Sequence, residues 1–296
     1  MPAGKTARAE SGKKMTPRKG FTRISKTDIY AAYGIEYRNG KILAPVYGWI
    51  NPLLINGNKK LGHGVYTWSM LPTNEMISYF ENGIKKQEMG TCPCTCRDEE
   101  TGEKTCYACG GCYLFNSTKL SLARKTILAR VYMDFVKRAI IAQIKASHIH
   151  ICRIHAAGDF FNAAYVEMWR DICRACPECL FWSYTKNPAA ESAFDGIDNC
   201  NIVKSLIPGR GKNYGKAGYV MSLYYALKAA GKTVYICRCG IDKDQHCTNC
   251  RHCAESEFVL FLEHGTSYKP EEDPLFPAFV ALVESQEEDA ESSAAA

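Results

Sequence analysis

Six cysteines lie between residues 92 and 112, the densest group of metal-binding side chains in the chain. An iron–sulfur cluster needs several thiolates on a loop that wraps its inorganic core, and a Cys-x-x-Cys-x-x-Cys run here supplies three of them. Zinc would take four of the six in a tetrahedral site. The spacing favours an iron–sulfur cluster, with zinc as the alternative. The members of this first cysteine loop are Cys92, Cys94, Cys96, Cys106, Cys109 and Cys112.

A second group, here called the C-terminal thiol set, lies between residues 237 and 253. Two ligand groups about ten residues apart, the second a Cys-x-x-Cys, are typical of a four-ligand metal site. Zinc and a four-iron cluster both fit this spacing. The set consists of Cys237, Cys239, Cys247, Cys250 and Cys253, with His246 and His252 between them.

A third triad, Cys173, Cys176 and Cys179, repeats the spacing at the end of a predicted helix. Spacing of three on a helix also marks a buried stripe, and reduced cysteine is among the most buried residue types. We therefore expect this triad to pack in the core. The isolated Cys152 and Cys200 are expected to do the same.

Polar side chains follow a predicted strand over residues 148–155. Arg153 and His155 alternate along it and are expected on one face, with Asp159 just beyond its end. Together they would provide an anion contact, a proton carrier and a hydrogen-bond acceptor. With Lys186 from the end of the next strand they are the predicted catalytic residues. The adjacent Tyr184 and Thr185 are predicted to bind a cofactor.

The segments that position these residues alternate between strand and helix. Predicted strands cover 65–70, 148–155, 180–185, 201–207 and 233–237, and predicted helices cover 73–87, 117–146, 162–174 and 222–230. Strands separated by helices imply βαβ units and a mainly parallel sheet. We predict an α/β fold, either a partial parallel βα barrel or an open parallel sheet, with cysteine-rich metal-binding loops. In both cases the carboxyl ends of the strands line the site.

Charge divides the 296-residue chain into regions. Residues 1–28 hold eight Lys/Arg and two acids and are predicted to be a disordered basic arm. Residues 29–236 form the predicted core with the first cysteine loop, and 237–269 hold the C-terminal thiol set. Residues 270–296 carry eight acids and no Lys or Arg, and we expect a largely disordered tail.

The composition also indicates what kind of partner the protein binds and in which cellular compartment it works. The net charge of 29–269 is +8, since the whole chain is +6 and its two ends are +6 and −8. This favours an anionic small molecule or nucleic acid as partner. The start lacks an apolar signal segment and no stretch is long enough to span a membrane, so we expect a cytoplasmic protein. Thiols stay reduced there, which favours metal binding over disulfides.

Several short strings together resemble the bacteriophage gene product eighty-eight family over about residues 65–255. They are Tyr66–Pro72, Thr91–Pro93, Cys106–Ala108, Arg153–Phe161, Phe181–Lys186 and Cys247–Cys253. The resemblance implies no firmly assigned activity. More distantly, the order of a cysteine loop, a long helix and a strand ending in a Gly-acidic motif looks like the radical S-adenosylmethionine enzymes.

That distant resemblance implies specific roles. Cys92, Cys96 and Cys106 would ligate a four-iron cluster, and Gly158 with Asp159 would hold the methionyl amine of S-adenosylmethionine. The sequence departs from the superfamily pattern C-x-x-x-C-x-x-C, because Glu99 stands where the third thiol would fall.

Two functions from different classes follow. The favoured one is an iron–sulfur metalloenzyme that holds one or two clusters and acts on an unknown substrate. The distant resemblance adds S-adenosylmethionine as its candidate cofactor. The alternative is a zinc-stapled phage protein that binds nucleic acid without catalysis, although no recognised nucleic-acid motif is present.

Overall fold

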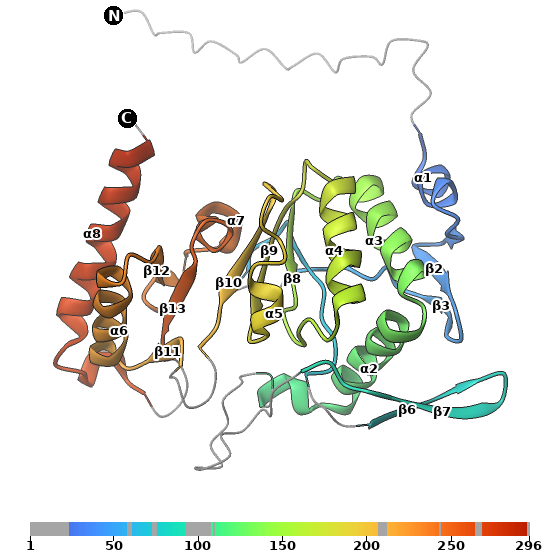
Figure 1. Cartoon of the computed structure of the whole chain (residues 1–296), viewed down its shortest axis with the longest axis horizontal. Coiled ribbons are helices and arrows are strands. Elements are labelled where there is room, and N and C mark those ends of the chain that lie inside the picture. Colours follow the sequence, from blue (N-terminus) through green and yellow to red (C-terminus); the bar gives the residue numbers. More distant parts are fainter. Residues whose placement is uncertain are drawn as a thin grey trace, which may run out of the picture.

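The computed structural model describes residues 24–294, except for 58–60, 73–75, 93–107, 109, 207–211, 243 and 264–267. The central element is a sheet of five strands in the order β10-β9-β8-β5-β4 (Figure 1). Its strands are β4 (Ile55–Asn56), β5 (Val65–Thr67), β8 (Ile151–Ile154), β9 (Leu180–Thr185) and β10 (Cys200–Lys204). Strands β5, β8, β9 and β10 are parallel, and β4 pairs antiparallel to β5.

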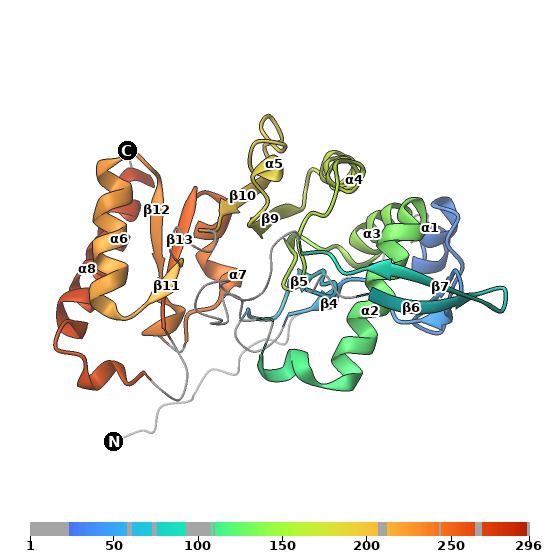
Figure 2. The same ribbon diagram turned by 60° about the horizontal axis from the view of Figure 1, so that its bottom comes forward.

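Helices α3 (Met133–Ser147) and α4 (Ala163–Ala175) supply most of the layer on one face of this sheet (Figure 2). Successive strand residues point to opposite faces, so Cys152 and Ile154 enter the main core with the helices. Ile151 joins a separate cluster on the other face, with Val65 and Trp182. The short helix α5 (Pro188–Glu191) follows β9. The two faces of the parallel strands therefore pack against different parts of the protein.

A second sheet in the order β11-β13-β12 lies beside β10. Asn213 joins the two sheets, because its side-chain amide donates to the carbonyls of Lys204 in β10 and Val259 in β13. Helices α6 and α8 pack on this sheet (Figure 1). The bounds are β11 (Tyr214–Gly215), α6 (Ala217–Ala229), β12 (Val234–Cys237), β13 (Phe258–Leu262) and α8 (Phe276–Ala294).

Within the described residues the main sheet is open and does not close into a barrel. The α/β class and the parallel pairing of the main strands are confirmed. No helix in the described part of the chain is both long and apolar enough to cross a bilayer.

An N-terminal unit packs against α3 through helix α1 (Lys26–Ala32). Ser25 and Asp28 form a reciprocal capping box at its start. An antiparallel three-stranded sheet follows, with the Tyr30 and Tyr37 rings stacked 4.5 Å apart. Its strands are β1 (Tyr37–Arg38), β2 (Lys41–Ala44) and β3 (Gly48–Ile50). The predicted arm thus ends in a helix from Lys26, and residues 1–23 lie outside the described residues.

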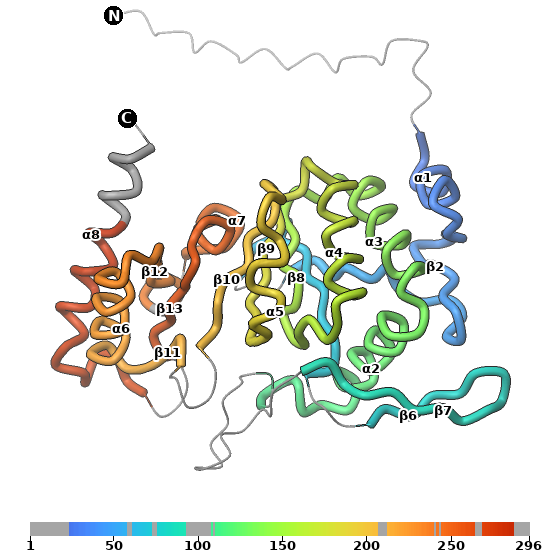
Figure 3. The backbone as a smooth tube through the Cα atoms, in the orientation of Figure 1, coloured from blue at the N-terminus to red at the C-terminus, as the bar shows by residue number. Residues whose placement is uncertain are grey.

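The helix predicted over residues 73–87 is wrong, because β6 (Met76–Glu81) and β7 (Ile84–Met89) form an antiparallel hairpin there. Ile77 and Tyr79 are buried while their neighbours are exposed, which is the period of a strand. Asn82 and Gly83 turn the chain at φ 52° and 78°, as in an Asn-Gly hairpin turn. The hairpin extends beyond the helical layer (Figure 3).

The long helix predicted over 117–146 is two helices, α2 (Asn116–Val131) and α3, separated at Tyr132. Tyr132 adopts φ −124° and ψ 46°, which is not helical. The apolar spacing continues across the break, so periodicity alone does not reveal it.

The largely disordered tail expected over 270–296 is also wrong, because Phe276–Ala294 form α8. Phe279 and Val283 are fully buried against the second sheet. Gln286 accepts the Ile236 N–H at 3.0 Å and donates to the Ile236 carbonyl at 2.8 Å. The segment is acidic overall, but its apolar residues Phe279 and Val283 and the Gln286 side chain attach the helix to the second sheet.

Candidate functional site

The end of β8 determines where the predicted site residues lie. His155 has φ 58°, in the left-handed region, so the strand alternation stops at Ile154. Arg153 faces Tyr184, with its guanidinium 5.1 Å from that ring centroid. His155 turns into the main core instead. The prediction that Arg153 and His155 share a face is therefore wrong, because His155 itself has a left-handed backbone that breaks the strand alternation.

His155 is buried in a directed hydrogen-bond chain. The Trp68 indole N–H donates to the Tyr165 hydroxyl at 2.9 Å, which leaves that hydroxyl to donate to His155 Nε2 at 2.9 Å. Nδ1 then carries the proton and donates to Ser183 Oγ at 3.2 Å. Burial, with the nearby Arg153 charge, lowers the pKa of His155 to about 3. The ring is therefore held neutral.

Asp159 lies at the carboxyl edge of the sheet and is 6% exposed. Its Oδ1 accepts the Thr185 hydroxyl and the Phe160 N–H, each at 2.7 Å, and Oδ2 accepts the Lys186 N–H at 2.9 Å. Burial raises the pKa of this carboxyl, and these donors and the Lys186 charge oppose the rise. The structure thus joins three predicted site residues, Asp159, Thr185 and Lys186.

Gly158 allows a close approach between this edge and the first cysteine loop. It has φ 88°, and a Cβ there would lie 2.7 Å from Thr91 Oγ1 and 3.0 Å from Met70 Cβ. Thr91 Oγ1 donates to the Leu71 carbonyl at 3.0 Å and accepts the Asp159 N–H at 3.4 Å. Cys92 follows directly, so the loop begins at the strand ends.

The other end of the same loop returns to the same place. Tyr113, in the 3-10 turn η2 (Gly111–Leu114), donates its hydroxyl to the Ala156 carbonyl at 3.3 Å. Cys92 is half-buried and Cys112 exposed. Cys94, Cys96, Cys106 and Cys109 lie outside the described residues. Both ends of the first cysteine loop therefore contact the segment 156–159 that follows β8.

Helix α2, which follows this loop, holds a buried lysine near the strand ends. Lys125 is 8% exposed, and its Nζ lies 5.3 Å from the Trp68 ring centroid. Burial lowers its pKa to about 8. The neighbouring Thr126 hydroxyl accepts the Leu71 N–H at 2.9 Å. The sequence pattern missed Lys125, because it does not fall on the apolar positions predicted for the helix.

The C-terminal thiol set gathers on the opposite face of the sheet from α3 and α4. Cys237 ends β12, and Cys239 lies in the turn η3 (Arg238–Gly240). Cys247 and Cys250 bound helix α7, and Cys253 lies in the turn η4 (His252–Ala254), which contacts β9 and β10 (Figures 1 and 2). The five predicted ligands thus lie on this face of the sheet, in two packing clusters that share Cys253.

The thiols of this set contact one another in pairs. Interaction with Cys239, together with burial, raises the pKa values of the Cys237 and Cys247 thiols. Cys253 lies within electrostatic reach of Cys237, Cys239 and Cys247. No group of three or more Cys, His, Asp or Glu side chains among the described residues is already arranged around one metal-ion position. Binding an ion would have to draw these side chains together.

The third triad is confirmed as core, since Cys173, Cys176 and Cys179 are all fully buried. Cys152 is buried with them, and Cys200 packs against the same cluster. Burial raises the pKa values of the triad thiols and of Cys152, so they stay protonated.

Asn199 explains the position of the triad. Its side-chain amide donates to the carbonyls of Cys173, Cys176 and Cys179 at 2.9–3.0 Å. These carbonyls belong to the end of α4 and the turn after it, where backbone acceptors lack helical partners. No spacing signal pointed to this residue.

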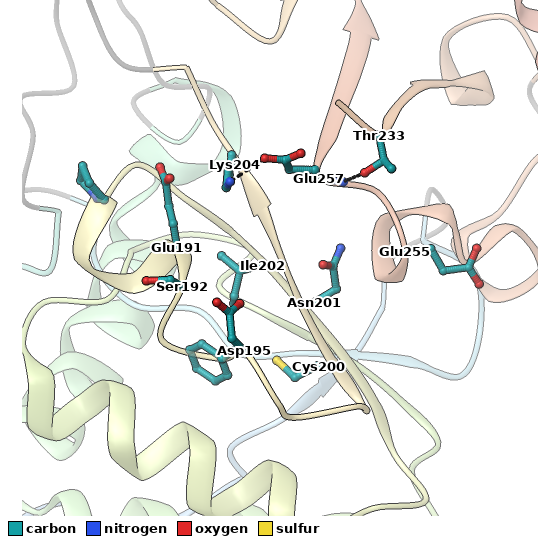
Figure 4. Close-up of a pocket in the computed structure, with 12 residues that line it drawn as sticks. Glu191, Ser192, Asp195, Cys200, Asn201, Ile202, Lys204, Thr233, Glu255 and Glu257 are labelled. Carbon is teal, nitrogen blue, oxygen red and sulfur yellow. Dashed lines mark hydrogen bonds and ion pairs between the residues drawn. The ribbon is translucent and has the colours of Figure 1, made fainter. Parts of the chain in front are cut away.

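A separate cavity of about 380 Å³ lies between β10, α5 and the start of β13 (Figure 4). It is rich in carboxylates, and Glu257 pairs with Lys204 at 2.6 Å and with Lys232 at 3.2 Å. None of the predicted catalytic, cofactor-binding or metal-binding residues lines this cavity. It is therefore distinct from the strand-end site.

These features define an open-sheet α/β protein with one cysteine loop at its strand ends and a thiol set behind the sheet. The chain belongs to the gene product 88 family, whose model matches residues 52–273. The match spans the main sheet and both cysteine groups. No curated protein and no solved structure is significantly similar to the chain. The family resemblance is thereby confirmed, and no relation to radical S-adenosylmethionine enzymes is shown.

Proposed function

We propose that this protein is an iron–sulfur enzyme whose active centre is held by the first cysteine loop at the carboxyl edge of β5, β8 and β9. The observation that carries the proposal is the anchoring of both loop ends, through Thr91 and Tyr113, on residues 156–159. Open α/β sheets bind their ligands beyond the carboxyl ends of the parallel strands. The described ends of the loop, beside Cys92 and Cys112, are therefore anchored where such a fold binds its ligands, which supports the proposal.

The residues of this edge have defined tasks in the proposal. Asp159 is occupied by hydrogen bonds from Thr185 and Lys186, so it positions the end of β9 rather than contacting a ligand. Lys186 provides a cation for an anionic substrate or cofactor group. Gly158 permits the close approach of the loop. The bound cluster would supply electron transfer, and the surrounding chain would set its potential and exclude water.

S-adenosylmethionine is the cofactor we propose for this centre. The support is the order of elements, with a cysteine loop between the first parallel strand and helix α2 and a Gly-Asp turn after β8. Equilibrium dialysis of the anaerobic protein with S-adenosylmethionine tests it. Binding that weakens in Gly158→Val, where the added side chain would meet Thr91, supports this cofactor. Absence of binding to a protein that holds its cluster rejects this cofactor alone.

The metal itself is tested by purifying the protein without oxygen and recording its visible absorption. We expect a brown protein whose colour is reduced in Cys106→Ser. The matched control Cys237→Ser removes one thiol of the C-terminal set and should leave the first-loop absorption in place. A colourless protein that holds only zinc would contradict the proposal. It would favour the alternative, a zinc-stapled protein that binds nucleic acid in a salt-dependent way.

A further inference from the structure

Lys125 occupies a position on α2 where an apolar side chain would be expected. The residues on the buried face of this helix recur at helical spacing, as Leu122, Lys125, Thr126 and Ala129. Lys125 is only 8% exposed on this face. Lysine is almost never buried to this extent unless a partner neutralises its charge. A solvated surface position therefore does not explain this amine.

The surroundings of the Lys125 amine provide no neutralising partner. Its Nζ lies 5.3 Å from the centroid of the Trp68 ring, and Trp68 is fully buried. In the part of the chain that the structure describes, no carboxylate pairs with this amine. Burying an unpaired ammonium is unfavourable, so the site favours the neutral amine more than water does.

The other cations in this part of α2 point elsewhere. The Arg124 guanidinium lies 5.8 Å from the centroid of the Tyr47 ring. Arg130 donates to the Gly90 carbonyl at 2.6 Å and lies over the Phe161 ring. These two side chains have partners of their own, so the buried amine is a separate feature of the helix.

The amine lies at the carboxyl edge of the main sheet. Trp68 directly follows β5, and its backbone pairs with the end of β8 and the turn beyond it. Its N–H donates to the Arg153 carbonyl at 3.2 Å, and its carbonyl accepts the Ala156 N–H at 2.9 Å. Open α/β sheets bind their ligands beyond this edge. Lys125 is therefore placed beside the position of a ligand.

We infer that Lys125 binds a carbonyl compound, an aldehyde or a ketone, by forming an imine with it. The amine nitrogen attacks the carbonyl carbon, and a C=N bond replaces the C=O bond. The two amine hydrogens leave with the carbonyl oxygen as water, so no oxidant or reductant is needed. Lysines in apolar surroundings are the ones that form such adducts. This inference names the substrate class of the strand-end site and rests on the proposed function only for that location.

Two features make the nitrogen a nucleophile. Burial lowers the pKa of Lys125 to about 8. About 10% of such an amine is neutral at pH 7, compared with less than about 0.1% of an unperturbed lysine. The indole N–H of Trp68 donates to the Tyr165 hydroxyl at 2.9 Å, so it leaves the lone pair of the lysine nitrogen free.

The experiment treats the full-length protein with glyoxylate, a small aldehyde, and with cyanoborohydride, which reduces an imine to a stable secondary amine. Peptide mass spectrometry then gives the rate of modification at each lysine. At pH 7 we expect Lys125 to react at least about ten-fold faster than Lys119, an exposed lysine of the same helix, because its roughly 100-fold advantage in neutral amine outweighs its lower exposure. A slower reaction at Lys125 than at Lys119 would overturn the inference.

Two matched variants on α2 identify the reacting residue. Lys125→Met keeps a long side chain in the buried position and should lose the fast adduct while the other lysines react as before. Lys119→Met should leave the fast adduct in place. If the fast adduct persisted in Lys125→Met, another lysine would be responsible and the inference would be wrong. Should Lys125→Met fail to fold, the rates at individual lysines of the natural protein still decide the question.

Iron and sulfide measured on the same preparations separate this inference from the proposed function. A protein that contains the cluster but shows no preference for Lys125 rejects the imine and leaves the enzyme proposal in place. A protein that forms the fast adduct but contains only zinc supports the imine and rejects the iron–sulfur centre. In Cys106→Ser we expect less iron and an unchanged rate at Lys125.

Discussion

His155 and Asp159 lie four positions apart, and both were predicted to be catalytic, yet they occupy different environments. His155 sits inside the aromatic core with both ring nitrogens paired, which is the arrangement of a structural histidine. Asp159 organises the polar ends of β8 and β9. At the scale of single residues, Asp159 positions this edge of the sheet, and Lys186 is the cation that the proposed function assigns to it.

The environment of His155 predicts a pH dependence of stability. Its pKa is lowered to about 3 in the folded protein, so the unfolded chain takes up this proton first as the pH falls. The contribution to stability is complete above about pH 6.5 and is lost progressively below it, by about 2 kcal/mol at about pH 5. Urea unfolding of the natural protein and His155→Gln at both pH values measures it. An equal pH slope in the two proteins would contradict it.

The Asp159 network predicts the effect of Thr185→Val. The change removes the hydroxyl that donates to Asp159 and accepts the Asn187 N–H at 3.0 Å, and it leaves buried groups unpaired. The free energy of unfolding should fall by about 1–3 kcal/mol. Thr233→Val is the control, because that hydroxyl is exposed and its loss should cost about 0.5 kcal/mol or less. Similar losses in both variants would count against the network.

At the scale of elements, strong local patterns were sufficient for part of the fold. The strand over 180–185 matches β9, and the helix over 162–174 matches α4 within one residue at each end. These segments have clear periodicity and ends set by Asn162 and Pro177. The open parallel sheet then followed from the order of its elements.

Other elements depended on contacts that the sequence does not display. The residues of the hairpin β6–β7 include many with high helix propensity, which led to the prediction of a helix. The Asn82-Gly83 pair is typical of a hairpin turn and indicates the correct structure. The tail α8 is stabilised by packing of Phe279 and Val283 on the second sheet. Composition alone predicts disorder there, because tertiary burial outweighs local charge.

The attachment of α8 predicts the effect of Gln286→Leu. Gln286 pairs with both backbone groups of Ile236 in the edge strand β12, and an apolar side chain would leave them unsatisfied. We expect a loss of about 1–3 kcal/mol in the free energy of unfolding. Faster proteolysis of the last helix should accompany it. Ser285→Ala changes the neighbouring exposed position and should have little effect; if it matched Gln286→Leu, the pairing would not be the cause.

At the scale of the whole molecule, the described cysteines fall into three places with three different surroundings. One group begins and ends at the strand-end edge, one lies on the sheet face at Tyr184, and one is fully buried at the end of α4. Identical spacing therefore does not imply an identical role. The surrounding elements separate the proposed metal ligands from core residues.

This division predicts that Cys179→Ala leaves the metal content unchanged. The thiol is fully buried among apolar groups, and its loss should lower the free energy of unfolding by about 1–3 kcal/mol. Metal analysis and urea unfolding of the same preparation measure both quantities. Loss of a metal centre in this variant would show that the third triad is a ligand set.

The central claim is that an iron–sulfur centre is held at the strand-end edge, and the most direct measurement is the iron and acid-labile sulfide bound per chain after purification without oxygen. The account predicts that both are present in the natural protein and that Cys106→Ser lowers them by the content of one cluster, with the fold intact. Zinc alone, without sulfide, would contradict it.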